Sequence, residues 1–261
     1  MEHFIVSARK YRPQNFADVI GQQSITNTLE KAIENNHLAQ ALLFTGPRGV
    51  GKTSCARILA KNINQQDAEL SSDEDFAFNI FELDAASNNS VDDIRSLTDQ
   101  VRIPPQTGKY KVYIIDEVHM LSTGAFNALL KTLEEPPKHV IFILATTEPH
   151  KIPPTIHSRC QRFDFRGVSI PDMIKTLNII IKKENIGIEK EAIKVIAESA
   201  EGGMRDAISL LDQVVSYSNE NVTTSDVHAI RGTVSNEKLL KIANAIYENN
   251  SVEAIKQLDD L

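Results

Sequence analysis

Five short apolar runs alternate with segments of helical periodicity along the first part of the chain. The runs are rich in Val, Ile, Leu and Phe and largely lack polar alternation, which is typical of strands buried on both faces of a parallel sheet. Because helical segments separate the runs, they predict an α/β fold with right-handed crossover connections. The predicted strands cover residues 41–45, 78–83, 111–115, 140–145 and 161–165.

Beyond Phe165 the pattern becomes helical throughout. Ser169 and Asp172 resemble the start of a capping box and predict the beginning of a first helix. A Gly-Gly pair at 202–203 precedes a third predicted helix at 204–218, and the stretch after Gly232 indicates two further helices that are cut short. We therefore expect three parts, which cover residues 1–165, 166–232 and 233–261.

Composition narrows the classes of function. The chain has 261 residues, of which 41% are hydrophobic, so it can bury one large core and a smaller one. Its net charge of −7 does not indicate a nucleic-acid binder, although it does not exclude a local basic patch. Two cysteines, Cys55 and Cys160, are too few for a disulfide framework or a four-cysteine zinc site. No apolar run is long enough to cross a bilayer, so we expect no membrane partner.

The most specific motif reads GPRGVGKT and lies between the strand at 41–45 and a helical stretch at 54–62. Its glycines allow backbone N–H groups to converge on an anion, and the helix N-terminus adds partial positive charge. Lys52 can then reach the β- and γ-phosphates of a nucleotide, and Thr53 can bind Mg²⁺. A Gly-rich turn without a ligand is the alternative. The residues predicted to hold the nucleotide here are Gly46, Pro47, Arg48, Gly49, Val50, Gly51, Lys52, Thr53 and Ser54.

A second motif ends the strand at 111–115, where Asp116 and Glu117 follow each other. In a phosphate-binding sheet the first acid holds Mg²⁺ and the second activates the attacking water as a base. Paired acids also occur on ordinary surfaces, so this motif indicates a catalytic site only together with the GPRGVGKT loop upstream. Thr147 ends the following predicted strand and can orient water beside the γ-phosphate, with Thr146 as the fallback. The alternative is a threonine hydrogen-bonded within its own loop.

Two arginines are candidates for phosphate contacts. Arg159, in a Ser-Arg-Cys segment, can act as an arginine finger in the nucleotide site of a neighbouring subunit. From spacing alone, an ordinary surface arginine is the better interpretation. Arg205 begins the helix at 204–218 and can reach the γ-phosphate from there. Its alternative is a helix-surface salt bridge with Glu201 or Asp206, which contributes little.

Together these motifs resemble the clamp-loader family of AAA+ ATPases in bacterial DNA polymerase III. The resemblance implies a P-loop AAA+ domain with a five-stranded parallel sheet at 1–165, an all-helical lid at 166–232 and the start of a truncated helical collar at 233–261. The segments that carry it are ARKYRPQNFADVIGQ (8–22), GPRGVGKT (46–53), FELDAAS (81–87), VYIIDEVHMLS (112–122), FNALLKTLEEPP (126–137), FILATTEPHKIPPTIHSRCQRFDF (142–165) and EGGMRDAISLLDQ (201–213).

The resemblance also implies roles for individual residues. Thr147 would be sensor 1, Arg205 sensor 2, and Arg159 the finger that acts in trans. Arg95, in the helix that begins near Ser90, is a weak candidate for a contact with template phosphates. An adenine pocket would be lined by Tyr11, Arg12, Pro13, Val19 and Ile20.

At the level of the assembly, the resemblance implies an ATP- and Mg²⁺-dependent ATPase of the bacterial cytoplasm, associated with the nucleoid. It would belong to the DNA polymerase III holoenzyme, a DNA-directed DNA polymerase and thus a transferase, without being the polymerising subunit. Its partners would be other copies of the ATPase subunit, the delta and delta-prime subunits, the sliding clamp and primer–template DNA. ATP binding would open the clamp, and DNA-triggered hydrolysis would release it closed on DNA.

One departure from the family concerns zinc. Family members usually carry a four-cysteine zinc module after the P-loop helix. The interval 62–79 has no cysteine here and is acidic instead, so we expect no zinc.

Three other interpretations account for part of these motifs. Residues 116–119 match the DExH pattern of superfamily 2 helicases, but no second RecA-like domain follows the sheet. Another AAA+ enzyme that acts on DNA, such as a Holliday-junction ATPase, would share the general motifs but not the LLKTLEEPP and SRC segments. A nucleotide-bound scaffold such as the delta-prime subunit lacks a working P-loop, whereas the loop and both acids are present here.

Overall fold

In the computed structural model, which describes residues 6–65, 79–105, 108–218, 221–233 and 236–259, five strands form one parallel sheet. Their order across the sheet is β2-β3-β4-β1-β5. The expected five-stranded parallel sheet is therefore confirmed, although Phe78, the predicted start of the second strand, lies outside the described residues. The strands are β1 Ala41–Thr45, β2 Ile80–Asp84, β3 Lys111–Asp116, β4 Val140–Thr146 and β5 Gln161–Asp164.

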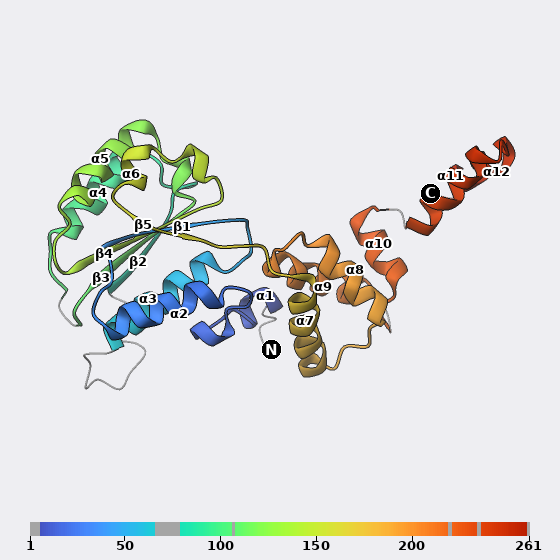
Figure 1. Cartoon of the computed structure of the whole chain (residues 1–261), viewed down its shortest axis with the longest axis horizontal. Helices are drawn as coiled ribbons and strands as arrows, with labels where there is room; N and C mark the ends of the chain where they lie inside the picture. Colours follow the sequence, from blue (N-terminus) through green and yellow to red (C-terminus); the bar gives the residue numbers. More distant parts are fainter. Residues whose placement is uncertain (1–5, 66–78, 106–107, 219–220, 234–235, 260–261) are drawn as a thin grey trace.

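Helices cover both faces of this sheet, as Figure 1 shows. One face packs against α2 and α3 in a core that includes Leu29 and Leu59. The opposite face packs against α4, α5 and α6 in a core that includes Leu129 and Ile156. The helices of this part are α2 Gln23–Glu34, α3 Lys52–Gln65, α4 Val91–Val101, α5 Thr123–Glu134 and α6 Pro154–His157, with 3-10 turns η1 Phe16–Asp18, η3 Val118–Met120 and η4 Pro149–Lys151.

The two edge strands differ from the sequence expectation. The central strands β1, β3 and β4 are buried along nearly their whole length, as their apolar runs predict. β2 is partly exposed throughout, and in β5 only Phe163 is buried. Each of these strands has a neighbour on one side only, so less of its surface is covered. The expectation of burial on both faces is wrong for β2 and β5.

An all-helical unit with a hydrophobic core of its own follows the sheet, and it confirms the expected helical lid. The Ser169 hydroxyl accepts a hydrogen bond from the backbone N–H of Asp172 and caps the first lid helix, as the sequence indicates. The lid helices are α7 Ile170–Glu184, α8 Lys190–Ser199, α9 Met204–Tyr217 and α10 Thr224–Arg231.

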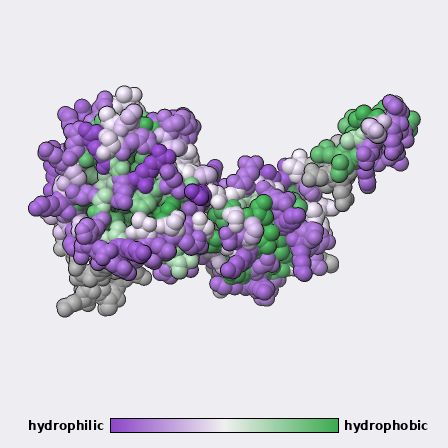
Figure 2. Space-filling view, viewed as in Figure 1, coloured by the Kyte–Doolittle hydropathy of each residue, from purple (hydrophilic) through white to green (hydrophobic). Residues whose placement is uncertain are grey.

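Beyond the lid, α11 Asn236–Tyr247 and α12 Ser251–Asp259 pack on each other and project away from it (Figure 1). Figure 2 shows apolar surface on this projecting pair. The boundaries 1–165, 166–232 and 233–261 stay a prediction for the domains. The exposed large apolar side chains of the pair are Leu239, Leu240, Ile246, Tyr247, Val252, Ile255 and Leu258.

The N-terminal helix α1 Ser7–Lys10 connects the sheet to the lid. It contacts α9, and the backbone N–H of Ser7 donates to Asp212 Oδ2 at 2.8 Å. Tyr11 and Ile20 pack against the lid core, whereas Val19 belongs to the sheet core. This segment therefore lies across the junction of the two units.

Within the described ranges, no helix has both the length and the apolar character needed to cross a bilayer. In the same residues, no group of three or more His, Cys, Asp or Glu side chains is arranged to hold a metal ion. The interval 62–79, on which the expected absence of zinc rests, lies mostly outside the described residues.

Candidate active site

The P-loop connects the carboxyl end of β1 to the first turn of α3. All residues of β1 are buried, so the strand fixes where the loop begins, and α3 starts at Lys52. The Lys52 ammonium donates hydrogen bonds to the carbonyl oxygens of Gly46 at 2.8 Å and Pro47 at 2.7 Å. The loop therefore folds around this ammonium, which is the arrangement expected at a phosphate-binding site.

The charge of Lys52 is balanced by the acid pair. Burial lowers the pKa of Lys52, and the nearby carboxylates of Glu117 and Asp116 act in the opposite direction. The residue is 6% exposed, so its ammonium has little contact with bulk water. A desolvated ammonium facing a Gly-rich loop fits the phosphates of a nucleotide.

A close backbone contact holds the start of the loop against the chain that leaves β5. Gly46 has a φ of +139°, and a Cβ at this position would lie 2.3 Å from the carbonyl oxygen of Phe165. Glycine is the residue that combines this φ with this approach.

Gly46→Ala is expected to destabilise the fold by about 2–4 kcal/mol, because the added methyl group meets backbone and the φ is unfavourable. Thermal unfolding measures the loss. Gly232→Ala is the matched control, since Gly232 also has a positive φ (+60°) but a Cβ there meets nothing within 4 Å. That control is expected to cost about 1 kcal/mol. Equal losses at the two positions would contradict the importance of the contact with Phe165.

The P-loop meets the acid pair at a single hydrogen bond. Thr53 Oγ1 donates to Asp116 Oδ2 at 2.7 Å. Asp116 ends β3, which β4 separates from β1 in the sheet, so the parallel arrangement brings both strand ends to the same edge. A hydroxyl and a carboxylate in contact fit the oxygen ligands that Mg²⁺ takes beside phosphate oxygens.

The Glu117 carboxylate faces the predicted sensor threonine. Glu117 has left-handed backbone angles, with φ 47° and ψ 44°. Its Oε2 accepts hydrogen bonds from the backbone N–H of Thr147 at 3.2 Å and from Thr147 Oγ1 at 2.9 Å. Thr146 is fully buried, and its Oγ1 accepts from the backbone N–H of Glu148 at 3.0 Å. The structure thus joins Glu117 to Thr147, not to the fallback Thr146.

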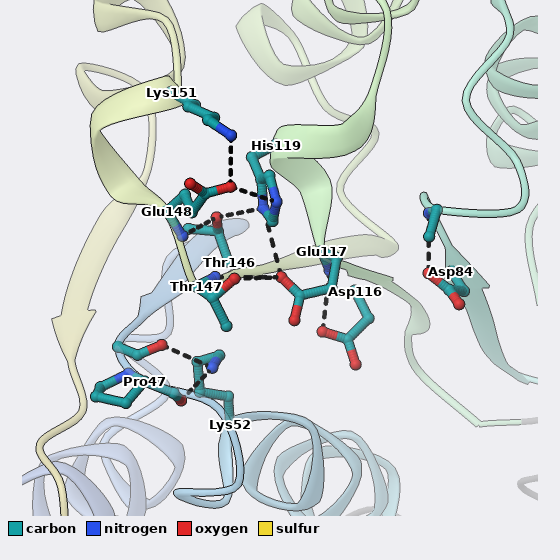
Figure 3. A network of polar contacts seen from close by, with 12 residues as sticks. Pro47, Lys52, Asp84, Asp116, Glu117, His119, Thr146, Thr147, Glu148 and Lys151 are labelled. Atoms are coloured by element: carbon teal, nitrogen blue, oxygen red, sulfur yellow. Dashed lines mark hydrogen bonds and ion pairs between the residues drawn. The ribbon is translucent and has the colours of Figure 1, made fainter. Parts of the chain in front are cut away.

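Three side chains that the sequence did not single out as site residues complete this network (Figure 3). His119 Nδ1 lies 3.0 Å from Thr146 Oγ1 and 3.4 Å from Glu117 Oε2. Its Nε2 lies 3.1 Å from Glu148 Oε2, which Lys151 Nζ also contacts at 2.7 Å. The hydrogen bond from Lys151 holds the pKa of Glu148 below its ordinary value. The sequence signal for His119 was its place in the DExH pattern, which points to a different enzyme class.

One of the residues expected to line an adenine pocket, Arg12, contacts the first turn of α3 just after the loop. Arg12 Nε donates to Ser54 Oγ at 3.3 Å, and burial together with neighbouring arginines, Arg205 among them, lowers the pKa of Arg12. The Tyr11 hydroxyl donates to the carboxylate of Glu184, at the end of α7. An adenine pocket stays a prediction for Tyr11, Arg12, Pro13, Val19 and Ile20.

The lid touches the P-loop directly. The backbone N–H of Arg205 donates to the carbonyl oxygen of Gly49 at 3.3 Å. Gly203 approaches the loop so closely that a Cβ there would lie 3.1 Å from the carbonyl oxygen of Arg48. The exposed Arg205 therefore stands in the first turn of α9, beside the loop that it is predicted to serve.

Arg159 is held at the surface by its own chain. Its Nη2 pairs with Glu134 at the end of α5 at 2.7 Å, and its Nη1 donates to the carbonyl oxygen of Thr155 at 2.7 Å. Arg95 lies on the exposed side of α4 and pairs with Asp92 at 3.4 Å. The structure brings neither arginine to the P-loop network through these contacts, so a role in trans for Arg159 and a DNA contact for Arg95 stay predictions.

Similarity to known proteins decides the family. Residues 21–169 match the family model of DNA polymerase III, delta subunit, and residues 173–220 match that of the DNA polymerase III clamp loader subunit, ATPase lid domain. DNA polymerase III subunit gamma of Buchnera aphidicola subsp. Baizongia pistaciae is 39% identical over 272 residues, covering 99% of this chain and 74% of the relative. The chain belongs to the DNA polymerase III gamma/tau family of clamp-loader subunits.

Longer members of the gamma/tau family are similar over the same region. DNA polymerase III subunit tau of Bacillus subtilis is 48% identical over 264 residues, which cover 97% of this chain and 47% of the relative. The subunit tau of Escherichia coli is 41% identical over 266 residues, which cover 98% of this chain and 41% of the relative. The chain therefore spans less than half the length of these two relatives.

A solved structure supports the AAA+ architecture of this gamma/tau family member. The Thermotoga maritima RuvB Holliday junction branch migration motor has a TM-score of 0.65 to this chain at 19% identity. The similarity covers 92% of this chain and 80% of that one. At this identity it shows the fold alone, which confirms the predicted P-loop AAA+ class.

Proposed function

We propose that this chain binds ATP with Mg²⁺ and hydrolyses it as the motor subunit of a clamp loader. The observation that carries the proposal is the contact between Thr53 and Asp116, which joins the P-loop to the acid pair. The burial of Lys52 in the loop supports phosphate binding, and the position of Glu117 beside Asp116 supports hydrolysis. Membership of the gamma/tau family supports the clamp-loading role.

Each side chain of the site would have a separate role in binding or hydrolysing ATP. Bound ATP would supply the γ-phosphoryl group, with Mg²⁺ neutralising charge on the phosphates. The Lys52 ammonium would donate to phosphate oxygens in place of the loop carbonyls that it contacts here. Thr53 and Asp116 would hold the metal. The Glu117 carboxylate would accept the proton of the attacking water while Thr147 holds its other oxygen.

We further propose that ATP binding opens a sliding clamp and that hydrolysis, triggered by primer–template DNA, releases it closed on DNA. The partners would be other gamma/tau copies, the delta and delta-prime subunits, the clamp and the DNA, in the bacterial cytoplasm. Arg159 would complete the nucleotide site of a neighbouring subunit, and Arg205 would couple the lid to the γ-phosphate. The support for these roles is the family assignment and the exposed positions of both arginines.

A second candidate is a nucleotide-bound scaffold that does not hydrolyse ATP. It is favoured by the match of residues 21–169 to a model of the delta subunit. Against it stand Lys52, Thr53 and Glu117, whose arrangement supports catalysis. Binding of ATP without turnover in the fully assembled complex would favour the scaffold.

The proposed function is tested by the ATPase rate of a reconstituted clamp loader that contains the full-length chain. Clamp and primed DNA are added separately and together. We expect strong stimulation when both are present. A rate that neither clamp nor DNA changes would contradict the clamp-loading role and favour another AAA+ activity.

Arg159→Ala is expected to reduce DNA-stimulated hydrolysis by about 10³-fold or more, because a trans-acting finger stabilises charge on the transferred phosphoryl group. The affinity of each chain for ATP is expected to stay unchanged, as measured with a fluorescent ATP analogue. Arg162→Ala is the control, since Arg162 is also exposed and pairs with Asp164 on β5. Weaker ATP binding by Arg159→Ala would mean that Arg159 acts in cis.

A further inference from the structure

His119 lies between two carboxylates at the carboxyl edge of the sheet. Its side chain is 7% exposed, whereas those of Glu117 and Glu148 are 33% and 35% exposed. Figure 3 shows the imidazole between these two acids, above the P-loop. The roles proposed above employ Glu117 and Thr147 and leave this buried imidazole without a task.

Hydrogen bonds define the orientation of the ring. Thr146 Oγ1 accepts the backbone N–H of Glu148 at 3.0 Å, so its own proton is available to His119 Nδ1, also at 3.0 Å. On the other side of the ring, Nε2 lies 3.1 Å from Glu148 Oε2. The imidazole is therefore anchored on one side by a buried hydroxyl and on the other by a carboxylate that Lys151 also holds.

The anchored ring limits where the Glu117 carboxylate can lie. Glu117 Oε2 is 3.4 Å from Nδ1, so the ring occupies the space on this side of the carboxylate. Thr147 donates two hydrogen bonds to the same Oε2. The other carboxylate oxygen points to the side on which Lys52 lies (Figure 3).

Such restraint matters for a glutamate that acts as a base. A free glutamate side chain samples several rotamers, and ordering it costs conformational entropy. A displacement of about 1 Å from the reactive geometry can lower a rate substantially. The left-handed backbone of Glu117 fixes the direction of its Cα–Cβ bond, but it does not fix the position of the carboxylate oxygens.

We propose that His119 is a positioning residue for Glu117. It confines Oε2 to the Thr147 donors and so directs the second carboxylate oxygen toward the nucleotide. The inference rests on the proposed function, because it requires Glu117 to be the base. His119 acts through Glu117 and needs no contact with the nucleotide.

The test compares His119→Ala, His119→Asn and His119→Gln in the reconstituted clamp loader with full-length chain, clamp and primed DNA. His119→Ala is expected to lower single-turnover ATP hydrolysis about tenfold without changing ATP affinity. The amide oxygen of Asn can replace Nδ1 beside Thr146, so His119→Asn should recover to within about threefold of the wild type. Gln reaches Glu148 instead, so His119→Gln should resemble His119→Ala.

A double-mutant cycle separates positioning from simple packing. In a Glu117→Gln background, His119→Ala is expected to change the remaining rate by less than about twofold, because the residue on which it acts has lost its function. If His119 acted only through packing, His119→Ala would lower the hydrolysis rate by the same factor in the wild type and in Glu117→Gln. The control is His150→Asn, since His150 is 73% exposed and lies 3.9 Å from the same Glu148. We expect no change from it.

Thermal unfolding identifies variants that fail to fold. If His119→Ala is one of them, the comparison of His119→Asn with His119→Gln decides whether His119 positions Glu117. Equal activity of the Asn and Gln variants, or recovery by Gln alone, would overturn the inference. An equal loss of hydrolysis rate from His119→Ala in the wild type and in Glu117→Gln would also overturn it. If Glu117→Gln hydrolyses ATP as fast as the wild type, the assignment of Glu117 as the base fails, and this inference with it, whereas a wild-type complex that does not hydrolyse ATP would contradict the proposed function itself.

Discussion

Lys52→Ala is expected to weaken ATP binding by about a hundredfold or more. The ammonium is buried in the P-loop and donates to the carbonyl oxygens of Gly46 and Pro47, so it is already desolvated and oriented. Alanine removes the charge-assisted hydrogen bonds that Lys52 would donate to phosphate oxygens, and the loss of two such bonds of about 1.5–3 kcal/mol each corresponds to this loss of affinity. Titration with a fluorescent ATP analogue measures the dissociation constant.

The control for this variant is Lys61→Ala, which removes the same charge from the same helix, α3, two and a half turns beyond the loop. We expect its affinity for ATP to match the wild type. Unchanged affinity in Lys52→Ala would contradict the P-loop as the nucleotide site. If Lys52→Ala and Lys61→Ala weaken ATP binding equally, the loss of positive charge would act on ATP affinity in general and not through the P-loop.

Glu117→Gln is expected to leave ATP bound and to slow its hydrolysis by about 10²–10⁴-fold, the usual contribution of a general base. Glutamine has nearly the same shape, and its amide oxygen can still accept the two hydrogen bonds from Thr147. It cannot take a proton from water at neutral pH. Rapid-quench measurement of a single turnover in the assembled complex gives the rate.

The matched control is Glu135→Gln, which changes a carboxylate at the C-terminal end of α5. Its hydrolysis rate is expected to equal that of the wild type. Normal turnover in Glu117→Gln would contradict the assignment of the base. Loss of ATP binding in Glu117→Gln would assign this carboxylate to binding instead of to proton transfer.

The contiguous parts of the site could be read from the sequence. The P-loop is one short segment, and its glycines, Lys52 and Thr53 are useful only after a strand and before a helix. The cap formed by Ser169 and Asp172 is equally local and is present as predicted. These features depend on neighbouring residues, so the order of the residues carries the information.

Contacts between distant segments could not be read in this way. His119 and Glu148 are in contact because η3 and the end of β4 meet at one edge of the sheet. Helix α1 precedes the sheet in sequence but packs on α9 of the lid. An apolar run such as β2 does not reveal that its strand lies at the edge, since that depends on strand order.

The sequence by itself determined the α/β class, the lid, the family and the P-loop, because periodicity and short motifs carry them. Only the tertiary structure decided that Thr53 meets Asp116, 63 positions away, and that His119 joins Glu117 to Glu148. It also placed Thr147, and not Thr146, in hydrogen-bond contact with Glu117. The physical reason is that neighbouring residues at a strand end point to different sides, so strand order and register determine which side chain faces the site.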